Sequence, residues 1–217
     1  MYRNKIPVTL PIMADGLVYS LVPIAAGAVA AIWSWTAAGV FIIPLAFILF
    51  FFRNPSRRDK AAPADILSPA DGTVMSITEV GHDDFIGGRA VNISVFLSIF
   101  SVHINRSPIS GTVRYHHYRE GAMLPAFKSH ASEINERNTV GIEADDGFRV
   151  LVHQITGFIA RRIVWWVRPG SALHRAERYG FIKFGSCTEL VVPYGTEIRV
   201  AVGQKVRAAQ TVMGRRT

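Results

Sequence analysis

The dipeptide Gly185-Ser186 lies close to the C-terminal end of this 217-residue chain and has the chemistry for self-cleavage. A serine hydroxyl can attack the carbonyl of the residue before it, so that the amide becomes an ester. Glycine suits the attacked side because it has no Cβ and tolerates a strained turn. Elimination from the ester leaves dehydroalanine, which hydrolyses to an N-terminal pyruvoyl group. Because Gly-Ser is also a common turn sequence, this interpretation depends on the residues that accompany it.

A carboxylate and a base that could activate Ser186 occur earlier in the chain, at Asp71 and His103. Asp71 lies in a turn sequence, Pro69-Ala70-Asp71-Gly72, and His103 is expected where an apolar strand ends and a loop begins. Serine needs a base to become a nucleophile, and histidine needs a carboxylate to fix its tautomer. Taken singly, each residue also has a structural reading, as a turn aspartate or a buried histidine. The remaining histidines show no ligand spacing, so no metal site is predicted.

An apolar stretch near the N-terminus predicts a membrane anchor. Gly16 to Phe52 contains no charged residue, and it is much longer than the roughly 20 residues that one membrane helix needs. Two short spans or a re-entrant hairpin fit best, with the turn near Ser34-Trp35-Thr36. Basic residues on both flanks favour placing both ends on the cytoplasmic side of the cell membrane; they are Arg3, Lys5, Arg53, Arg57, Arg58 and Lys60.

The remainder of the chain predicts a mainly β (α+β) domain with a barrel or sandwich-like core. We expect the anchoring segment to cover residues 1–60 and the β domain residues 61–217. Only Met123 to Asn138 and Ser171 to Arg178 look helical or irregular. Short β-branched runs bounded by Gly, Asp or Pro indicate strands; they are Thr73 to Ile77, Ala90 to Phe96, Gly111 to Tyr115 and Phe148 to Val152.

Composition narrows the class of partner. The formal net charge is +8, but zinc-finger spacing and RNP-like aromatic motifs are missing from the sequence, so a nucleic-acid partner is not expected. A basic protein with a membrane anchor more simply meets anionic lipid head groups. The single cysteine, Cys187, excludes an intramolecular disulfide and suits a reducing compartment.

Several motifs in order resemble the phosphatidylserine decarboxylase family, in particular the short, membrane-anchored bacterial form of the proenzyme. The resemblance covers nearly the whole chain from the apolar stretch onward. The matching segments are Ser68-Pro69-Ala70-Asp71-Gly72, Phe96-Leu97-Ser98, Val102-His103-Ile104-Asn105-Arg106, Asn135-Glu136-Arg137-Asn138, Gln154-Ile155-Thr156-Gly157, Ala160-Arg161-Arg162-Ile163, Ile182-Lys183-Phe184-Gly185-Ser186 and Gly203-Gln204-Lys205-Val206.

The resemblance implies a zymogen that cuts itself between Gly185 and Ser186 and keeps the large and small chains together as a heterodimer. Asp71 and His103 carry over as the charge relay for this autocatalytic cleavage. The pyruvoyl group derived from Ser186 would form a Schiff base with phosphatidylserine in the membrane, act as an electron sink during decarboxylation and yield phosphatidylethanolamine. His103 is the candidate acid that protonates the carbon after CO2 leaves.

One departure from the family pattern concerns the division of labour between residues. Longer family members carry a second histidine three residues after the first, where this chain has Arg106, so whether His103 serves both cleavage and turnover stays open. Candidates for binding the lipid phosphate are Arg106, Lys128, Arg137 and Arg161. Two alternatives remain: a pyruvoyl decarboxylase of another serine-headed lipid or a soluble amino acid, and a non-enzymatic, membrane-tethered adaptor whose Gly185-Ser186 bond stays uncut.

Overall fold

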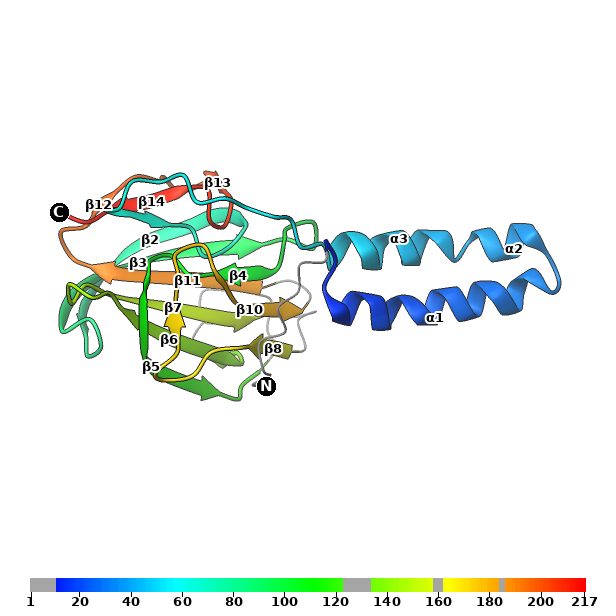
Figure 1. Ribbon diagram of the computed structural model, residues 1–217, viewed down its shortest axis with the longest axis horizontal. Helices are drawn as coiled ribbons and strands as arrows, with labels where there is room; N and C mark the ends of the chain where they lie inside the picture. The colour runs from blue at the N-terminus through cyan, green and yellow to red at the C-terminus, as the bar shows by residue number, and fades with distance from the viewer. Residues whose placement is uncertain (1–10, 123–133, 158–161, 184–185) are drawn as a thin grey trace. The chain divides into compact units, whose positions relative to one another are not determined.

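The structure is a computed structural model, and its described residues fall into two compact units, one within Ile6–Ser56 and the other within Arg57–Thr217. The described residues are 11–122, 134–157, 162–183 and 186–217. The first unit consists of helices and the second mainly of strands (Figure 1).

The first unit is a helical hairpin. Helix α1 (Ala14–Ala31) packs against α3 (Ile42–Phe51), and the short helix α2 (Trp35–Gly39) lies between them in the chain. The Ser34 hydroxyl caps α2 by accepting a hydrogen bond from the Ala37 N–H at 3.5 Å. A serine at this position satisfies a backbone donor that a helix start leaves unpaired. The predicted turn near Ser34 is therefore confirmed.

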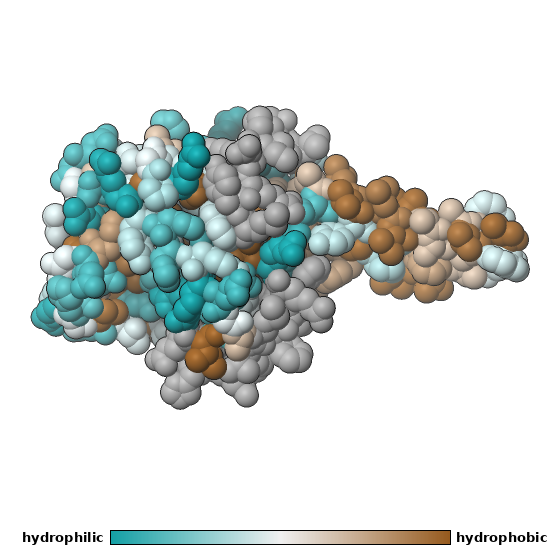
Figure 2. Space-filling view, turned by 90° about the horizontal axis from the view of Figure 1, so that it is seen from below, coloured by the Kyte–Doolittle hydropathy of each residue, from teal (hydrophilic) through white to brown (hydrophobic). Residues whose placement is uncertain are grey.

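The surface of this hairpin is apolar. Within the described residues, α1 is the one helix long and apolar enough to cross a membrane, with a length of 18 residues. Figure 2 shows the hairpin as largely hydrophobic. At its base the Met13 N–H donates to the Phe52 carbonyl at 2.9 Å. Phe52 packs so closely against Gly16 that a Cβ there would lie 2.4 Å from the Phe52 Cβ.

The second unit is organised around one large antiparallel sheet. Its eight strands follow the order β13-β2-β3-β11-β7-β6-β5-β9, and Figure 1 shows the sheet curled into a half-barrel. The strands are β2 (Gly72–Asp83), β3 (Gly88–Leu97), β5 (Gly111–Arg119), β6 (Arg137–Glu143), β7 (Arg149–Thr156), β9 (Ala172–Leu173), β11 (Ser186–Pro193) and β13 (Lys205–Val206). The prediction of a mainly β fold is confirmed.

Two smaller sheets share the core with the large sheet. One has the order β4-β10-β8 and the other β1-β14-β12. Tyr179, Ile66 and Met213 bring one residue from each of three small-sheet strands into a common cluster with Val152 and Leu190 of the large sheet. The small-sheet strands are β4 (Ile104–Arg106), β8 (Arg162–Trp165), β10 (Arg178–Lys183), β1 (Asp65–Leu67), β12 (Glu197–Ile198) and β14 (Val212–Arg215).

The predicted strands lie inside β2, β3 and β5, and the fourth lies inside β7 except for Phe148, which precedes it. Both segments expected to be helical or irregular need a correction, because Ser171 to Arg178 contains β9 and the first residue of β10. Most of Met123 to Asn138 lies outside the described residues, but its last two residues, Arg137 and Asn138, begin β6. They pair with Ile155 and Gln154 of β7. Their polar side chains do not suggest a strand, because this part of β6 is stabilised by pairing with its neighbours rather than by local propensity.

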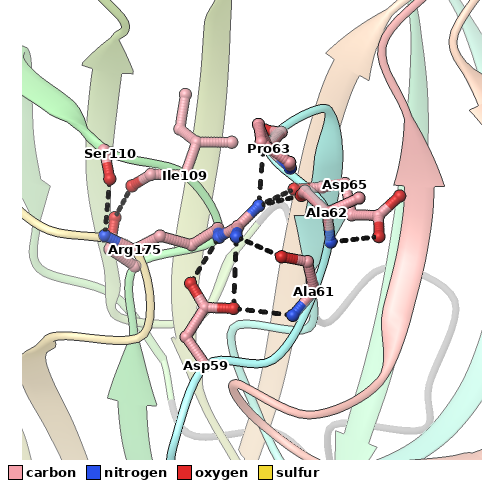
Figure 3. Close-up of polar contacts among 9 residues, drawn as sticks. Asp59, Ala61, Ala62, Pro63, Asp65, Ile109, Ser110 and Arg175 are labelled. Atoms are coloured by element: carbon pink, nitrogen blue, oxygen red, sulfur yellow. Dashed lines mark hydrogen bonds and ion pairs between the residues drawn. The ribbon is translucent and has the colours of Figure 1, made fainter.

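Residues 59–65, which precede and enter β1, are held by Arg175 from the segment between β9 and β10 (Figure 3). The guanidinium donates from Nε to Asp59 Oδ2 at 2.6 Å and from Nη1 to the Ala62 carbonyl at 2.6 Å. Nη1 also donates to the Asp65 carbonyl at 2.9 Å. Because the planar guanidinium offers several donors in one plane, one side chain can fix several backbone groups.

Candidate active site

The predicted cleavage bond falls between two strands that belong to different sheets. β10 ends at Lys183 in a small sheet, whereas β11 begins at Ser186 between β3 and β7 of the large sheet. The Ser186 backbone is paired with Leu97 on one side and Thr156 on the other. Gly185 and the side chain of Ser186 lie outside the described part of the chain. The start of β11 is therefore fixed by backbone pairing with both neighbouring strands.

His103 is buried beside the strand that leads to this bond. Its carbonyl accepts a hydrogen bond from the Ile182 N–H at 3.1 Å. In the side chain, Nδ1 lies 3.0 Å from the Ser101 carbonyl oxygen. Because a carbonyl can only accept, Nδ1 carries the proton of the neutral ring and Nε2 is the basic nitrogen. The structure thus places a histidine in a tautomer suited to base catalysis.

The position of His103 in the chain differs from the prediction that it ends a strand. β3 already ends at Leu97, and His103 directly precedes β4. The apolar run is broken by Ser98, whose hydroxyl accepts from the Phe100 N–H at 3.3 Å and whose carbonyl accepts from the Ser101 N–H at 2.9 Å. Serine favours such turns because its hydroxyl competes for backbone donors.

Asp71 lies in the turn directly before β2, and its carboxylate is held by partners that sequence reasoning missed. Its carboxylate accepts a bidentate pair from Arg57, with Nη2 at 2.6 Å from Oδ2 and Nη1 on Oδ1. The Ala208 N–H also donates to Oδ1, at 2.8 Å. The turn that carries Asp71 is joined to β4 because the Arg106 N–H donates to the Pro69 carbonyl at 2.9 Å. A relay from Asp71 to His103 stays a prediction.

A continuous row of polar side chains, here called the amide chain, runs from half-buried His116 into the core of the domain. His116 Nε2 lies 2.7 Å from Asn138 Oδ1, and Asn138 Nδ2 donates to Gln154 Oε1 at 2.7 Å. Gln154 Nε2 donates to Asn105 Oδ1 at 2.8 Å, and Asn105 Nδ2 donates to Thr188 Oγ1 at 3.0 Å. The four members after His116 are each 0% exposed. Their one sequence signal is an amide or hydroxyl inside an otherwise apolar strand.

Arg106 lies in a buried cationic environment close to Asp71. Its guanidinium donates to the Ala176 carbonyl at 3.0 Å. Burial lowers the pKa of Arg106 to about 10, and the nearby Arg57 and Arg178 act in the same direction. The carboxylate of Asp71 opposes this shift. An excess of positive charge in a partly desolvated place suits an anionic group.

The other three candidates for binding the lipid phosphate have less structural support than Arg106. Arg137 has its guanidinium 3.6 Å from Glu189, and burial lowers its pKa while Glu189 opposes the shift. Lys128 and Arg161 lie outside the described residues.

Cys187, directly after Ser186, is buried, and burial followed by the charge of Glu189 raises the pKa of its thiol. The thiol therefore stays protonated and is a poor nucleophile.

Comparison with known proteins shows the family of the chain. The sequence model of the phosphatidylserine decarboxylase family matches residues 45–214. The chain is 54% identical over 182 residues to a phosphatidylserine decarboxylase proenzyme from Carboxydothermus hydrogenoformans, a match that covers 83% of this chain and 84% of that relative. It is 46% identical over 189 residues to a protein of the same name from Symbiobacterium thermophilum, covering 87% and 88% of the two chains.

These matches cover most of the chain, and the class of enzyme that they define is a decarboxylase, a lyase that breaks a carbon–carbon bond. The chain belongs to the phosphatidylserine decarboxylase family.

Proposed function

We propose that this chain converts phosphatidylserine to phosphatidylethanolamine with a pyruvoyl group that it makes from Ser186. The names of its relatives support this substrate. Within the molecule, one observation carries the proposal: the His103 carbonyl accepts a hydrogen bond from the N–H of Ile182, three residues before Gly185. A buried base is thereby kept next to the segment on which the chemistry must occur.

Self-cleavage requires His103 to act on Ser186. The Ser186 hydroxyl gives its proton to His103 Nε2 and attacks the Gly185 carbonyl, so that the peptide bond becomes an ester. Loss of the Ser186 Cα proton then expels the Gly185 carboxylate, and hydrolysis of the resulting dehydroalanine releases ammonia. The negative charge of Asp71 favours the protonated imidazole in the first step.

The position of Ser186 fits a covalent carbonyl group. Pairing with Leu97 and Thr156 would hold the start of β11 in place after the chain is cut. The pyruvoyl group supplies an electron sink, because its Schiff base with the substrate amine takes up the electron pair released with CO2. His103 holds the proton that the resulting carbon needs. Of the two described candidates for the lipid phosphate, we favour Arg106, because Arg137 is paired with Glu189.

The two chains produced by this cut would remain one molecule. The small chain would begin at Ser186 and carry the last strands of the domain. β11 pairs with β3 and β7, β13 pairs with β2, and β14 pairs with β1. Since each of these pairings joins the small chain to the large one, a stable heterodimer follows.

We also propose that the helical hairpin anchors the protein in the cell membrane, with the decarboxylase domain on the cytoplasmic face. An apolar helix of spanning length supports the anchor. The basic residues that flank the apolar stretch support the orientation. A membrane-bound enzyme would meet its phospholipid substrate without extracting it into water.

Intact-mass measurement of the purified full-length protein tests the proposal. We expect two chains, and the small chain should lie about 17 Da below a chain that starts with unmodified serine, because elimination and hydrolysis remove ammonia overall. The small chain should also resist Edman degradation. Borohydride added with phosphatidylserine should fix the substrate amine to the small chain and abolish activity, whereas depletion of pyridoxal phosphate should change nothing.

Three results would contradict the proposal in different ways. An uncut chain without activity would support the non-enzymatic adaptor. A small chain with a free Ser186 amine would rule out the pyruvoyl mechanism even if the chain were cut at the predicted bond. Preferred turnover of another serine-headed lipid, or of free serine, would keep the mechanism and change the substrate.

A further inference from the structure

We propose that the amide chain positions His103 against the start of β11 and that this positioning matters most after the backbone has been cut. The inference rests on the proposed function, because it assigns a role in turnover to residues that do not touch the reacting bond. Asn105, Gln154 and Thr188 are the members that carry it. They are positioning residues, acting through His103 and through the first residues of β11.

The amide chain links the two sheets that the cleavage bond separates. Asn105 lies on β4, two residues after His103, whereas Thr188 lies on β11, two residues after Ser186. The 3.0 Å bond from Asn105 Nδ2 to Thr188 Oγ1 and the 2.8 Å bond from Gln154 Nε2 to Asn105 Oδ1 both cross from one sheet to the other. A direct side-chain bridge therefore spans the two elements that must face each other.

The direction of these hydrogen bonds is fixed along the whole chain. Each inner amide donates with its NH2 group and accepts with its oxygen, so no member can turn over without breaking two bonds. The outer end is closed by His116, which must donate from Nε2 because the Asn138 oxygen can only accept. Burial lowers the pKa of His116, which favours the neutral ring in this position.

The surrounding backbone leaves room for this chain at one place in particular. A Cβ on Gly180 would lie 2.6 Å from Gln154 Nε2 and 2.9 Å from the Val164 carbonyl. Glycine at position 180 thus lets the amide of Gln154 reach Asn105 between the two sheets. A buried amide without partners is costly, so a satisfied set of amides admits one relative placement of the strands.

Cleavage increases the importance of this bridge. In the uncut chain, the backbone between Lys183 and Ser186 joins the two sheets covalently. Once the Gly185-Ser186 bond is broken, that link is gone, and non-covalent contacts alone keep β4 and β10 in place relative to β11. The amide chain is a buried, directional contact of this kind next to His103. Its loss should therefore impair turnover by the cut enzyme more than the cleavage that precedes it.

The experiment compares two threonines of the same sheet. Thr188→Val keeps the shape and removes the hydroxyl that accepts from Asn105. Thr139→Val is the matched control, because Thr139 is also buried but its hydroxyl pairs with His153 Nδ1, at 2.9 Å. Thr139 directly follows Asn138 in β6, so its side chain lies on the other face of the sheet from the amide chain. Thr188→Ser restores the hydroxyl. The full-length variants are left to cleave themselves, and their pyruvoyl content is then titrated so that kcat can be expressed per pyruvoyl group. The parameters kcat and KM for phosphatidylserine are measured in mixed micelles.

We expect kcat per pyruvoyl group to fall about tenfold in Thr188→Val with KM unchanged, because one directional hydrogen bond that places the proton donor is lost. Cleavage should slow no more than about twofold, and Thr188→Ser should recover turnover to within about twofold of wild type. Thr139→Val should turn over like wild type.

Equal kcat values for Thr188→Val and Thr139→Val would overturn this inference. So would a change in KM alone, or a Thr188→Val chain that is never cut, because the bridge would then act before cleavage. The proposed function would still stand if the wild-type protein were cut and active. An uncut and inactive wild-type chain would contradict the proposed function and this inference together.

Discussion

At the scale of residues, His103 and Asp71 have different hydrogen-bond partners. The Ser101 carbonyl already fixes the tautomer of His103 through Nδ1, and Arg57 with Ala208 fixes the carboxylate of Asp71. In the proposed cleavage, the task left for Asp71 would be electrostatic, because its charge would favour the imidazolium that forms when Ser186 loses its proton. Removing the base should therefore cost more than removing the carboxylate's charge.

This ordering can be measured by following the loss of precursor on a gel after a pulse of synthesis. Ser186→Ala should remain full length, since no nucleophile is left. His103→Ala should slow cleavage about 100-fold or more, the usual contribution of a positioned base. Asp71→Asn should also slow cleavage greatly, but less than His103→Ala.

His82→Ala provides the control for these variants, because His82 lies on the surface with its side chain 66% exposed and should be cleaved normally. Normal processing of His103→Ala would remove His103 from the cleavage role. Cleavage of Ser186→Ala at the same bond would show that another nucleophile acts.

Sequence reasoning named candidate reactive residues but not the groups that hold Asp71 and His103. Gly185, Ser186, Asp71 and His103 stood out because their types suit one reaction. The pairing of Arg57 with Asp71 could not be read from the sequence, because Arg57 looked like one more basic residue flanking an anchor. Only the folded linker brings the two together.

At the scale of elements, four strands were predictable from their local pattern, whereas β6 and the neighbours of each strand were not. Runs such as Ala90 to Phe96 alternate and are β-branched, so their local preference agrees with the structure. The amide chain, by contrast, depends on the register of β5, β6, β7, β4 and β11 at once. A shift of one residue in any of these strands would turn its member of the amide chain to the other face. No local pattern carries that information.

The linker held by Arg175 gives a stability prediction at this scale. Arg175→Met keeps the aliphatic length and removes the donors to the Asp59 carboxylate and to the Ala62 and Asp65 carbonyls. The free energy of unfolding should fall by about 2–3 kcal/mol, because charge-assisted hydrogen bonds are lost and several acceptors lose their partner. Denaturant unfolding of the uncut Ser186→Ala protein in detergent measures this change.

The comparison for Arg175→Met is Arg199→Met. Arg199 also forms an ion pair, with Glu197 at 3.0 Å, but both side chains are exposed. Its loss should change stability by less than about 0.5 kcal/mol. Equal effects of the two substitutions would show that Arg175 does not hold the linker.

At the scale of the whole molecule, we expect the hairpin to provide membrane contact and the β domain to provide the chemistry. The protein should stay with membranes after washing with high salt or carbonate, because the contact of the apolar stretch with lipid does not depend on salt. Both flanks of that stretch should be protected from protease added to the outside of intact cells. Release by salt alone would show that the hairpin is not inserted and that basic residues hold the protein by charge.

The central place of β11 in the large sheet has a consequence for the lifetime of the enzyme. In the precursor this strand reaches its slot between β3 and β7 as part of a single chain. After the proposed cut, a small chain that came loose would have to find the same slot again from solution, at a rate that depends on concentration. The mature enzyme would then be a one-way product of folding. Its durability would be set by how slowly it unfolds, and molecules that unfold would be lost instead of recovered.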